Sequence, residues 1–411
     1  MSTNKASVIY TLSLVLLLAC YMLPFVRMHL DVIKLTVLNL AFIVVFVSPK
    51  HGFKILAGAS FRLIPFILIS FLVSTGMSVK YGIIHKYMMF FNMIVPALLA
   101  IDLICRGNKR ELYAVFASIS IMIAYVLILS YIEILYNPEV LREMTAISVT
   151  DEDYIAEMQS KGIGGFGMAY GCGLLMLAYA TIVQYIKNRY LRIFVYGIIA
   201  GLITFIFNAN FTTLLFISII CLVLHLLISY LSRGYIIKTI AIMIIFIFGV
   251  FYLPTILEFA INYYGDTSIA HHLSDILDLI EGNQVTESER DHISAMLWDG
   301  ILDNPLWGRN IYDSSTFLLY VNSHSTILGH AYATGIIGIV SYFSALWFVV
   351  NKLIVCVGIP KNVYIVLITY YLLLGYFNPS ESLEVSICAF LYPPLLCNII
   401  FERYGIKTME N

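Results

Sequence analysis

The chain has 411 residues, of which 60% are hydrophobic and only 12% are charged, and its mean hydropathy is +0.89. Soluble domains carry roughly a quarter charged residues, so this composition excludes a water-exposed globular surface. A formal net charge of −1 with no basic tract argues against a nucleic-acid partner. Apolar runs able to cross a hydrocarbon core of roughly 30 Å recur along the chain, which predicts an all-α polytopic membrane protein.

About twelve transmembrane helices are expected within a single membrane domain, residues 1–411. The expected spans lie at 7–24, 32–48, 61–78, 87–104, 112–135, 163–186, 192–208, 211–231, 235–253, 326–350, 362–378 and 384–401. Residues 1–24 have no small-residue cleavage site, so they are expected to remain as the first span. The seven cysteines are scattered without a CxxC pair, which argues against a disulfide framework or a zinc site.

Lysine and arginine fall in alternate loops, which sets the expected orientation. With Lys5 on the inside, every inside loop is basic, and the opposite loops collect nearly all the acids. The positive-inside rule then places both termini in the cytoplasm and the loops 137–162 and 254–325 outside it. ATP is absent there and the chain lacks a GxxxxGK[ST] phosphate loop, so a synthetic reaction on that side needs a pre-activated donor.

The loop 254–325 is the longest polar segment, inserted between the ninth and tenth spans. Residues 269–280 have the spacing of a helix lying on the membrane surface. A second helix is expected to begin after Ser288 and to end at Asn304-Pro305, with Arg290 and His292 in its first turn. Its expected apolar stripe consists of Ile293, Met296, Leu297, Gly300 and Ile301.

Arg290 and His324 are the two candidate catalytic residues. A guanidinium at a helix start suits a diphosphate, because it grips two oxygens and the helix dipole adds positive potential. The alternative for Arg290 is an exposed ion pair with Glu287 or Glu289. His324 stands where the loop enters the tenth span, and a neutral imidazole there can accept a proton from a sugar hydroxyl. Its alternative is an interfacial histidine bonded to a backbone carbonyl.

Further polar residues are candidates for substrate binding on the same side. The cations Arg142, Lys161 and Arg309 can help to neutralise a diphosphate, although each has the alternative of a solvated loop charge. His292 joins them from the helix start, and Asn210 lies in a polar corner that either contacts sugar or caps a turn. No HxxxH spacing with a carboxylate is present, so no metal is expected.

Two further patterns in the sequence bear on nucleotide binding and on transport. The glycines of 162–173 contain GxGGxG but lead into a membrane helix, so they are interpreted as helix packing rather than a dinucleotide site. Ionisable residues within the expected spans are scarce, and Asp102 and Glu133 lie near span ends. Because intramembrane charges mark transport paths, their scarcity weakens a transporter hypothesis.

Together these motifs resemble the O-antigen polymerase/ligase superfamily, with Wzy-type repeat-unit polymerases as the nearest likeness. The resemblance rests on the topology and on Ser288-Glu-Arg290, Trp298, Asn304-Pro-Leu-Trp-Gly308, His324-Ser-Thr-Ile-Leu and Gly335-Ile-Ile-Gly338. The chain departs from that pattern after the seventh span, where Asn210-Phe-Thr-Thr carries no arginine.

The resemblance implies a glycosyltransferase of GT-C-like architecture that needs no cofactor. It implies an undecaprenyl-diphosphate-linked oligosaccharide as substrate, chemistry at the periplasmic face of a bacterial inner membrane, and a chain-length regulator protein as a further partner. The family's functional arginine and histidine map onto Arg290 and His324. Two alternatives remain: an O-antigen ligase, which joins finished O-chain to the lipid A core, and a transporter of lipid-linked sugars.

Overall fold

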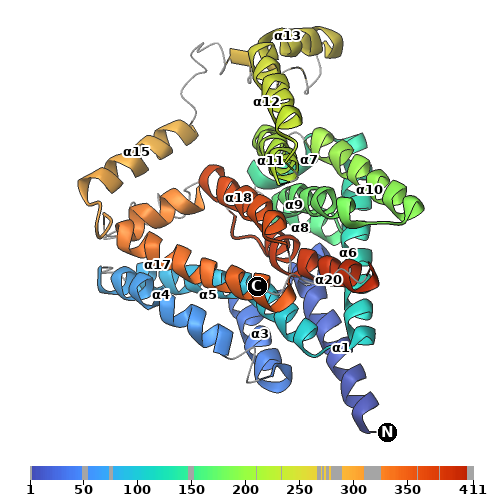
Figure 1. The fold of residues 1–411 in the computed structure, drawn as a ribbon. Helices are drawn as coiled ribbons and strands as arrows, with labels where there is room; N and C mark the ends of the chain where they lie inside the picture. Colours follow the sequence, from blue (N-terminus) through green and yellow to red (C-terminus); the bar gives the residue numbers. More distant parts are fainter. Residues whose placement is uncertain are drawn as a thin grey trace.

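The computed structural model describes residues 2–48, 54–73, 77–146, 152–209, 211–232, 234–265, 289–309, 325–358, 360–378 and 380–404, with isolated positions between 266 and 288. All regular secondary structure in these residues is helical (Figure 1). The first half of the chain forms α1 (Ser2–Met22), α2 (Pro24–Arg27), α3 (Val32–Phe46), α4 (Lys54–Val73), α5 (Met77–Cys105), α6 (Lys109–Tyr136), α7 (Val140–Ala146), α8 (Glu152–Ser160) and α9 (Phe166–Ile182). The second half forms α10 (Arg189–Asn208), α11 (Thr212–Leu231), α12 (Ile236–Phe251), α13 (Leu253–Tyr264), α15 (Glu289–Asp303), α17 (Thr326–Val357), α18 (Lys361–Phe377), α19 (Leu383–Ser386) and α20 (Tyr392–Tyr404).

Eight helices in the described residues are long and apolar enough to cross a membrane, or nine if α12 and α13 count as one bent span. They suggest a multi-pass membrane protein. Each of the expected segments falls on a helix, but fewer than twelve qualify. The shorter apolar helices α3 and α18 have 15 and 17 residues. At a rise of 1.5 Å per residue they reach only about 22 to 26 Å, less than a full hydrocarbon core.

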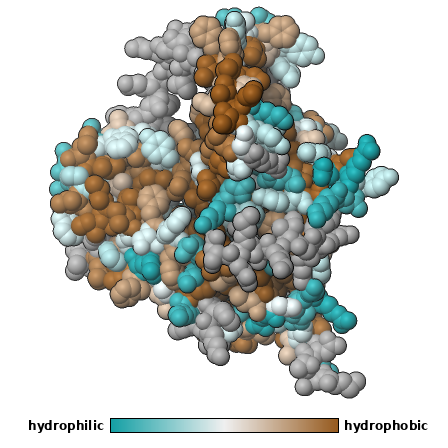
Figure 2. Space-filling view, in the orientation of Figure 1, coloured by the Kyte–Doolittle hydropathy of each residue, from teal (hydrophilic) through white to brown (hydrophobic). Residues whose placement is uncertain are grey.

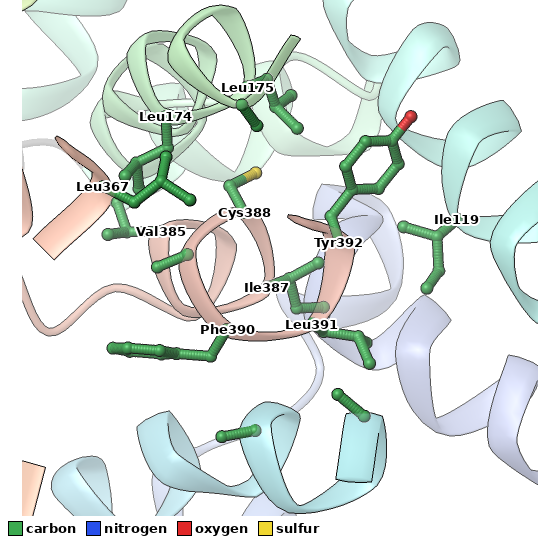
Figure 3. Close-up of a cluster of buried hydrophobic side chains, with 14 of the residues drawn as sticks. Ile119, Leu174, Leu175, Leu367, Val385, Ile387, Cys388, Phe390, Leu391 and Tyr392 are labelled. Atoms are coloured by element: carbon green, nitrogen blue, oxygen red, sulfur yellow. The ribbon is translucent and has the colours of Figure 1, made fainter. Parts of the chain in front are cut away.

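Three of the candidate spans form the centre of the bundle. The windows in α5, in α9 and in the run from α19 through α20 are 78%, 89% and 83% buried, whereas those in α6, α10 and α11 are buried by less than a third. The peripheral helices therefore turn apolar side chains outward, as lipid contact requires. Figure 3 shows the central packing, where Cys388 points toward α9, which carries Leu174 and Leu175.

Glycines in α9 let the central helices approach closely. A Cβ on Gly171 would lie 3.0 Å from the sulfur of Cys388, and one on Gly173 would lie 2.2 Å from the hydroxyl oxygen of Tyr370. That hydroxyl donates a 3.0 Å hydrogen bond to the backbone oxygen of Tyr170. The glycine run therefore lies in helix contacts at these positions, as its interpretation as packing requires.

The helices α12 and α13 project from the bundle and meet at a bend of 57° (Figure 1). The surface of α12 is strongly apolar in Figure 2, and Ile237 and Ile245 are 83% and 70% exposed. Pro254 stands in the first turn of α13, where a missing N–H costs nothing, so the chain restarts a helix in a new direction. The expected surface helix at 269–280 lies mostly outside the described residues.

Candidate functional site

Buried polar side chains gather at two levels of the otherwise apolar bundle. At the first level the Asp102 carboxylate accepts hydrogen bonds from Arg106 Nε at 2.8 Å, from Tyr10 Oη at 3.1 Å and from the backbone N–H of Ser48 at 3.1 Å. The second level begins at Tyr21, 11 residues along α1 from Tyr10. A rise of 1.5 Å per residue separates the two levels by about 16 Å, roughly half a bilayer core.

The second level forms the floor of a pocket of about 550 Å³. Its walls come from the segment 27–35, from α5, from residues 144–167 and from residues 381–384. Its charged lining residues are Arg27, Asp31, Glu381 and Glu384, accompanied by the amides of Asn92 and Gln159 and the ring of Phe166. This volume and this mixture of aromatic, amide and charged groups are typical of a small-molecule site.

Arg27 and Glu384 form an ion pair at the pocket wall, from Arg27 Nη1 to Glu384 Oε1. The Glu384 side chain is 4% exposed, so the partner arginine is what makes its charge tolerable there. Gly167, in the first turn of α9, permits the close approach of these segments. A Cβ at Gly167 would lie 2.5 Å from Ser382 Oγ and 2.6 Å from Glu384 Oε2.

His330 and Glu381 form a second buried pair. His330 Nε2 lies 2.9 Å from Glu381 Oε1, and both side chains are at most 4% exposed. The imidazole N–H is the donor of this hydrogen bond when the carboxyl group is ionised, since a carboxylate only accepts. The His330 ring is also packed against Phe66, at a centroid distance of 5.1 Å, and against Tyr342, at 4.8 Å. Glu381 is also one of the residues that line the pocket, so His330 is bonded to a residue of the pocket wall.

The amide of Asn92 lies in a hydrogen-bond network beneath the pocket. Asn39 Nδ2 donates to Tyr21 Oη at 2.7 Å and to Asn92 Oδ1 at 2.9 Å, and Thr36 Oγ1 donates to the same Oδ1 at 3.3 Å. The hydroxyl of Tyr21 in turn donates to the backbone oxygen of Asn92 at 3.0 Å. This network fixes the orientation of the amide, because its acceptor oxygen is already engaged.

Two exposed charged groups, Asp31 of the pocket lining and Lys161 of the loop 137–162, have pKa values shifted by local hydrogen bonds. Asp31 caps α3, and the backbone N–H of Lys34 at 2.7 Å lowers the pKa of its carboxyl group. The Lys161 ammonium lies 2.7 Å from Glu157 Oε1, and this hydrogen bond raises its pKa. Both lysines are exposed, so these are surface interactions of small energy.

The loop 137–162 contributes to the pocket through residues other than the expected cations. Met144, Ile155 and Gln159 line it, whereas Arg142 and Lys161 are exposed and do not. Arg309 is also exposed, and its Nη1 lies 3.6 Å from Asp303 Oδ2.

The other candidates lie in or beside parts of the chain that the structure does not describe. Arg290 and His292 occupy the first turn of α15, as expected, but their side chains lie outside the described residues. His324 and Asn210 lie outside them altogether. Ser325, which follows His324, caps α17 and donates to the backbone oxygen of Gly375 at 3.2 Å. Ser380 N donates to Thr326 Oγ1 at 2.9 Å, so this helix start is tied to the segment that carries Glu381.

The helix α15 packs on the first half of α17 (Figure 1). Leu297 contacts Leu328 and Tyr332, with Ile293 and Ile301 packed beside them. The expected stripe is therefore correct at these three positions of α15. It is wrong at Met296, which is 42% exposed, because that residue lies at the edge of the face defined by 293, 297 and 301.

Two glycines join the turn after α15 to a break in α17. Gly335 has φ 60° and ψ −164° inside α17, and Gly308 has φ 77°. Across this contact Ile336 N donates to the oxygen of Pro305 at 2.9 Å, and Arg309 N donates to the oxygen of Tyr332 at 2.8 Å. The motifs 304–308 and 335–338, noted separately in the sequence, therefore form one backbone-to-backbone contact, here called the glycine clasp (residues 305–309 with 332–336).

Sequence reasoning gave no role to Arg27, Glu381 or Glu384. The expected span boundaries put Glu381 in a short connection between two spans, but it is buried and lines the pocket. The signal that could have found them was the spacing of two glutamates in Ser380-Glu-Ser-Leu-Glu384, where two acids enter an apolar segment.

In the described part of the chain, no group of three or more His, Cys, Asp and Glu side chains is arranged to hold a metal ion. No family model, curated protein or solved structure matches the chain.

Proposed function

We propose that the chain is a repeat-unit polymerase of the O-antigen or capsular type. It transfers a growing glycan from undecaprenyl diphosphate to a sugar hydroxyl of a new lipid-linked repeat unit. The observation that carries the proposal is the pocket at the second polar level, because its carboxylates, amides and aromatic ring are the groups that bind sugars. The positive-inside orientation assigns this end of the bundle to the periplasm.

The helix α17 connects the pocket to α15, the helix that carries Arg290. The first half of α17 contacts α15, which carries Arg290, and also presents His330 to the pocket carboxylate Glu381. In the proposed reaction the acceptor oxygen attacks the anomeric carbon while the bond to the diphosphate oxygen breaks. Arg290 stabilises the charge that develops on the leaving diphosphate, and His324 orients the acceptor hydroxyl.

The proposed polymerase has the full set of expected transmembrane spans and one protein partner. All of the expected segments cross the bacterial inner membrane, so α3, α4 and α18 are counted as spans beside the eight or nine candidates. Both termini are cytoplasmic, and a chain-length regulator protein is the expected partner. Short or bent helices cross a bilayer when the surrounding lipid thins or flanking residues snorkel.

The test replaces Arg290 or His324 by alanine and compares the resulting lipopolysaccharide on a gel. Loss of the ladder of chain lengths is expected at an unchanged amount of inserted protein. Arg110→Ala is the matched control, because Arg110 is likewise the second residue of its helix, α6, but lies at the opposite end of the bundle. A normal ladder from either site variant would overturn that residue's role.

Gene deletion separates the polymerase from its alternatives. A polymerase deletion leaves a single repeat unit on the lipid A core, whereas loss of a ligase leaves the core bare. The buried pairs Arg27–Glu384 and His330–Glu381 are the kind of intramembrane charge that a lipid-linked sugar transporter needs. Repeat units trapped on the cytoplasmic leaflet after deletion would favour that function instead.

A further inference from the structure

We infer that the pocket is the acceptor subsite of the polymerase, that it binds the uncharged sugar of the incoming repeat unit, and that Glu381 accepts the proton of its attacking hydroxyl. This inference rests on the proposed function. It assigns a catalytic role to a residue that neither the sequence motifs nor the resemblance single out.

The charge of the pocket favours a sugar over a diphosphate. Among the described residues, its charged lining consists of three carboxylates, Asp31, Glu381 and Glu384, and one guanidinium, Arg27. That guanidinium is already paired with Glu384. A diphosphate with two or more negative charges would meet net negative potential here, whereas sugar hydroxyls donate hydrogen bonds to carboxylates at no such cost. The diphosphate therefore binds outside this pocket, toward the arginines of the surrounding loops.

Of the two buried carboxylates, Glu381 is the better proton acceptor. Glu384 is already engaged in an ion pair with the Arg27 guanidinium. Among the residues that the structure describes, the imidazole of His330 is hydrogen-bonded to Glu381, and its ring packs against Phe66 and Tyr342. His330 thus acts as a positioning residue, since it holds one oxygen of a carboxylate that lines the cavity.

The reaction balances with these groups alone. The acceptor O–H bond breaks and its proton passes to Glu381, while the oxygen forms a bond to the anomeric carbon of the donor. The bond from that carbon to the diphosphate breaks, and its electron pair leaves with the diphosphate oxygen. No oxidant, metal or further reactant is required.

The test uses the full-length protein in liposomes, with the lipid-linked repeat unit extracted from a strain that lacks this gene. Glu381→Gln removes the proton acceptor but keeps the side-chain shape, so the polymerisation rate is expected to fall on the order of 10²- to 10⁴-fold. Glu111→Gln is the matched control, because Glu111 is also a buried carboxylate, 5% exposed, with a hydroxyl partner at the other end of the bundle. That variant is expected to keep the wild-type rate.

Two further readouts separate chemistry from structure. Glu381→Ala leaves space for a small carboxylate, so added formate is expected to restore part of the rate, which a merely structural loss would not allow. His330→Asn is expected to lower kcat with the KM for the acceptor nearly unchanged, since His330 positions the base rather than the sugar. If Glu381→Gln does not insert, Glu381→Asp takes its place, with a rate loss of at least tenfold expected.

The acceptor assignment is tested by competition. The free repeat-unit oligosaccharide, released from its lipid by mild acid, is expected to inhibit, and Gln159→Leu is expected to weaken that inhibition about five- to tenfold. Inhibition by inorganic pyrophosphate should not change in the same variant. A polymerisation rate of Glu381→Gln within threefold of wild type, or a loss of pyrophosphate inhibition in Gln159→Leu, would overturn the inference. Absence of polymer from the wild-type protein would instead overturn the proposed function.

Discussion

The variant Gly335→Ala is expected to destabilise the protein, because Gly335 lies in the glycine clasp. The backbone of Gly335, at φ 60° and ψ −164°, lies in a region that other residues adopt only with strain of about 1–3 kcal/mol. Its added Cβ would also lie 2.5 Å from the carbonyl carbon and oxygen of Leu306 and 2.6 Å from the amide nitrogen of Gly308. Backbone atoms cannot rotate away as a flexible side chain does, so the two segments must separate.

Separation breaks a weak 3.4 Å hydrogen bond from Ile337 N to Leu306 O and the two stronger bonds, from Ile336 N to Pro305 O and from Arg309 N to Tyr332 O. At about 1 kcal/mol each, the two stronger bonds bring the expected loss of unfolding free energy to about 3–5 kcal/mol. The measurement is unfolding in mixed detergent micelles, followed by circular dichroism. Gly197→Ala serves as the control, because nothing lies within 4 Å of a Cβ there.

The control is expected to be neutral or to gain up to about 1 kcal/mol, since alanine favours a helix over glycine. If Gly335→Ala unfolds within about 0.5 kcal/mol of Gly197→Ala, the clasp does not hold these segments together and the reasoning is refuted. Retained stability in Gly308→Ala, where the Cβ would lie 2.6 Å from three backbone atoms of the 332–334 segment, would count against it in the same way.

Three other predictions concern the two polar levels and the orientation. Gly167→Ala should abolish polymerisation while leaving the protein inserted, because its Cβ would push apart the pocket walls; a wild-type rate would show that these walls can relax. Asp102→Asn should destabilise the fold by about 3–5 kcal/mol in the same micelle assay, since Arg106 would lose its buried partner, and a change below about 1 kcal/mol would contradict this. Cys105 and Cys356 are exposed thiols at the end assigned to the cytoplasm, so an impermeant maleimide should label them only after the membrane is permeabilised. Labelling in intact spheroplasts would invert the orientation.

Hydropathy and helix signals predicted the elements well because those signals are local. Each expected span falls on a helix, and Asn304-Pro305 ends α15 beside the expected Gly308 turn. The span count differs because α3 and α18, at 15 and 17 residues, are too short to qualify and α4 is not among the candidate spans. The expected span 235–253 corresponds to α12, and α13, beyond the bend, occupies the start of the expected loop 254–325.

The pocket could not be predicted in this way, because its polar groups find their partners across the fold. Arg27 and Glu384 are 357 residues apart in the sequence, and His330 and Glu381 are 51 residues apart. In a hydropathy profile each acidic residue only lowers the mean hydropathy of its own segment. The basic side chain that offsets the desolvation penalty of a buried acid comes from a distant segment, so it can be identified only in the packed structure.

The first half of α17 explains how one helix can serve both the pocket and α15. His330 stands two residues from Leu328 and two from Tyr332, and each residue turns the helix by about 100°. His330 therefore faces roughly 200° away from both apolar residues, so one face meets Glu381 while the opposite face meets Leu297 of α15.

This segment, residues 326–334, is held at both ends. Thr326 is bonded to Ser380 at its start, and the clasp at Gly335 holds its end. A helix of nine residues is about 13 Å long, too short to flex appreciably between two fixed ends. The break at Gly335 thus uncouples it from the long remainder of α17, which packs against α4 and α5. One short helical segment therefore carries both His330, which is bonded to Glu381, and the two residues that contact α15.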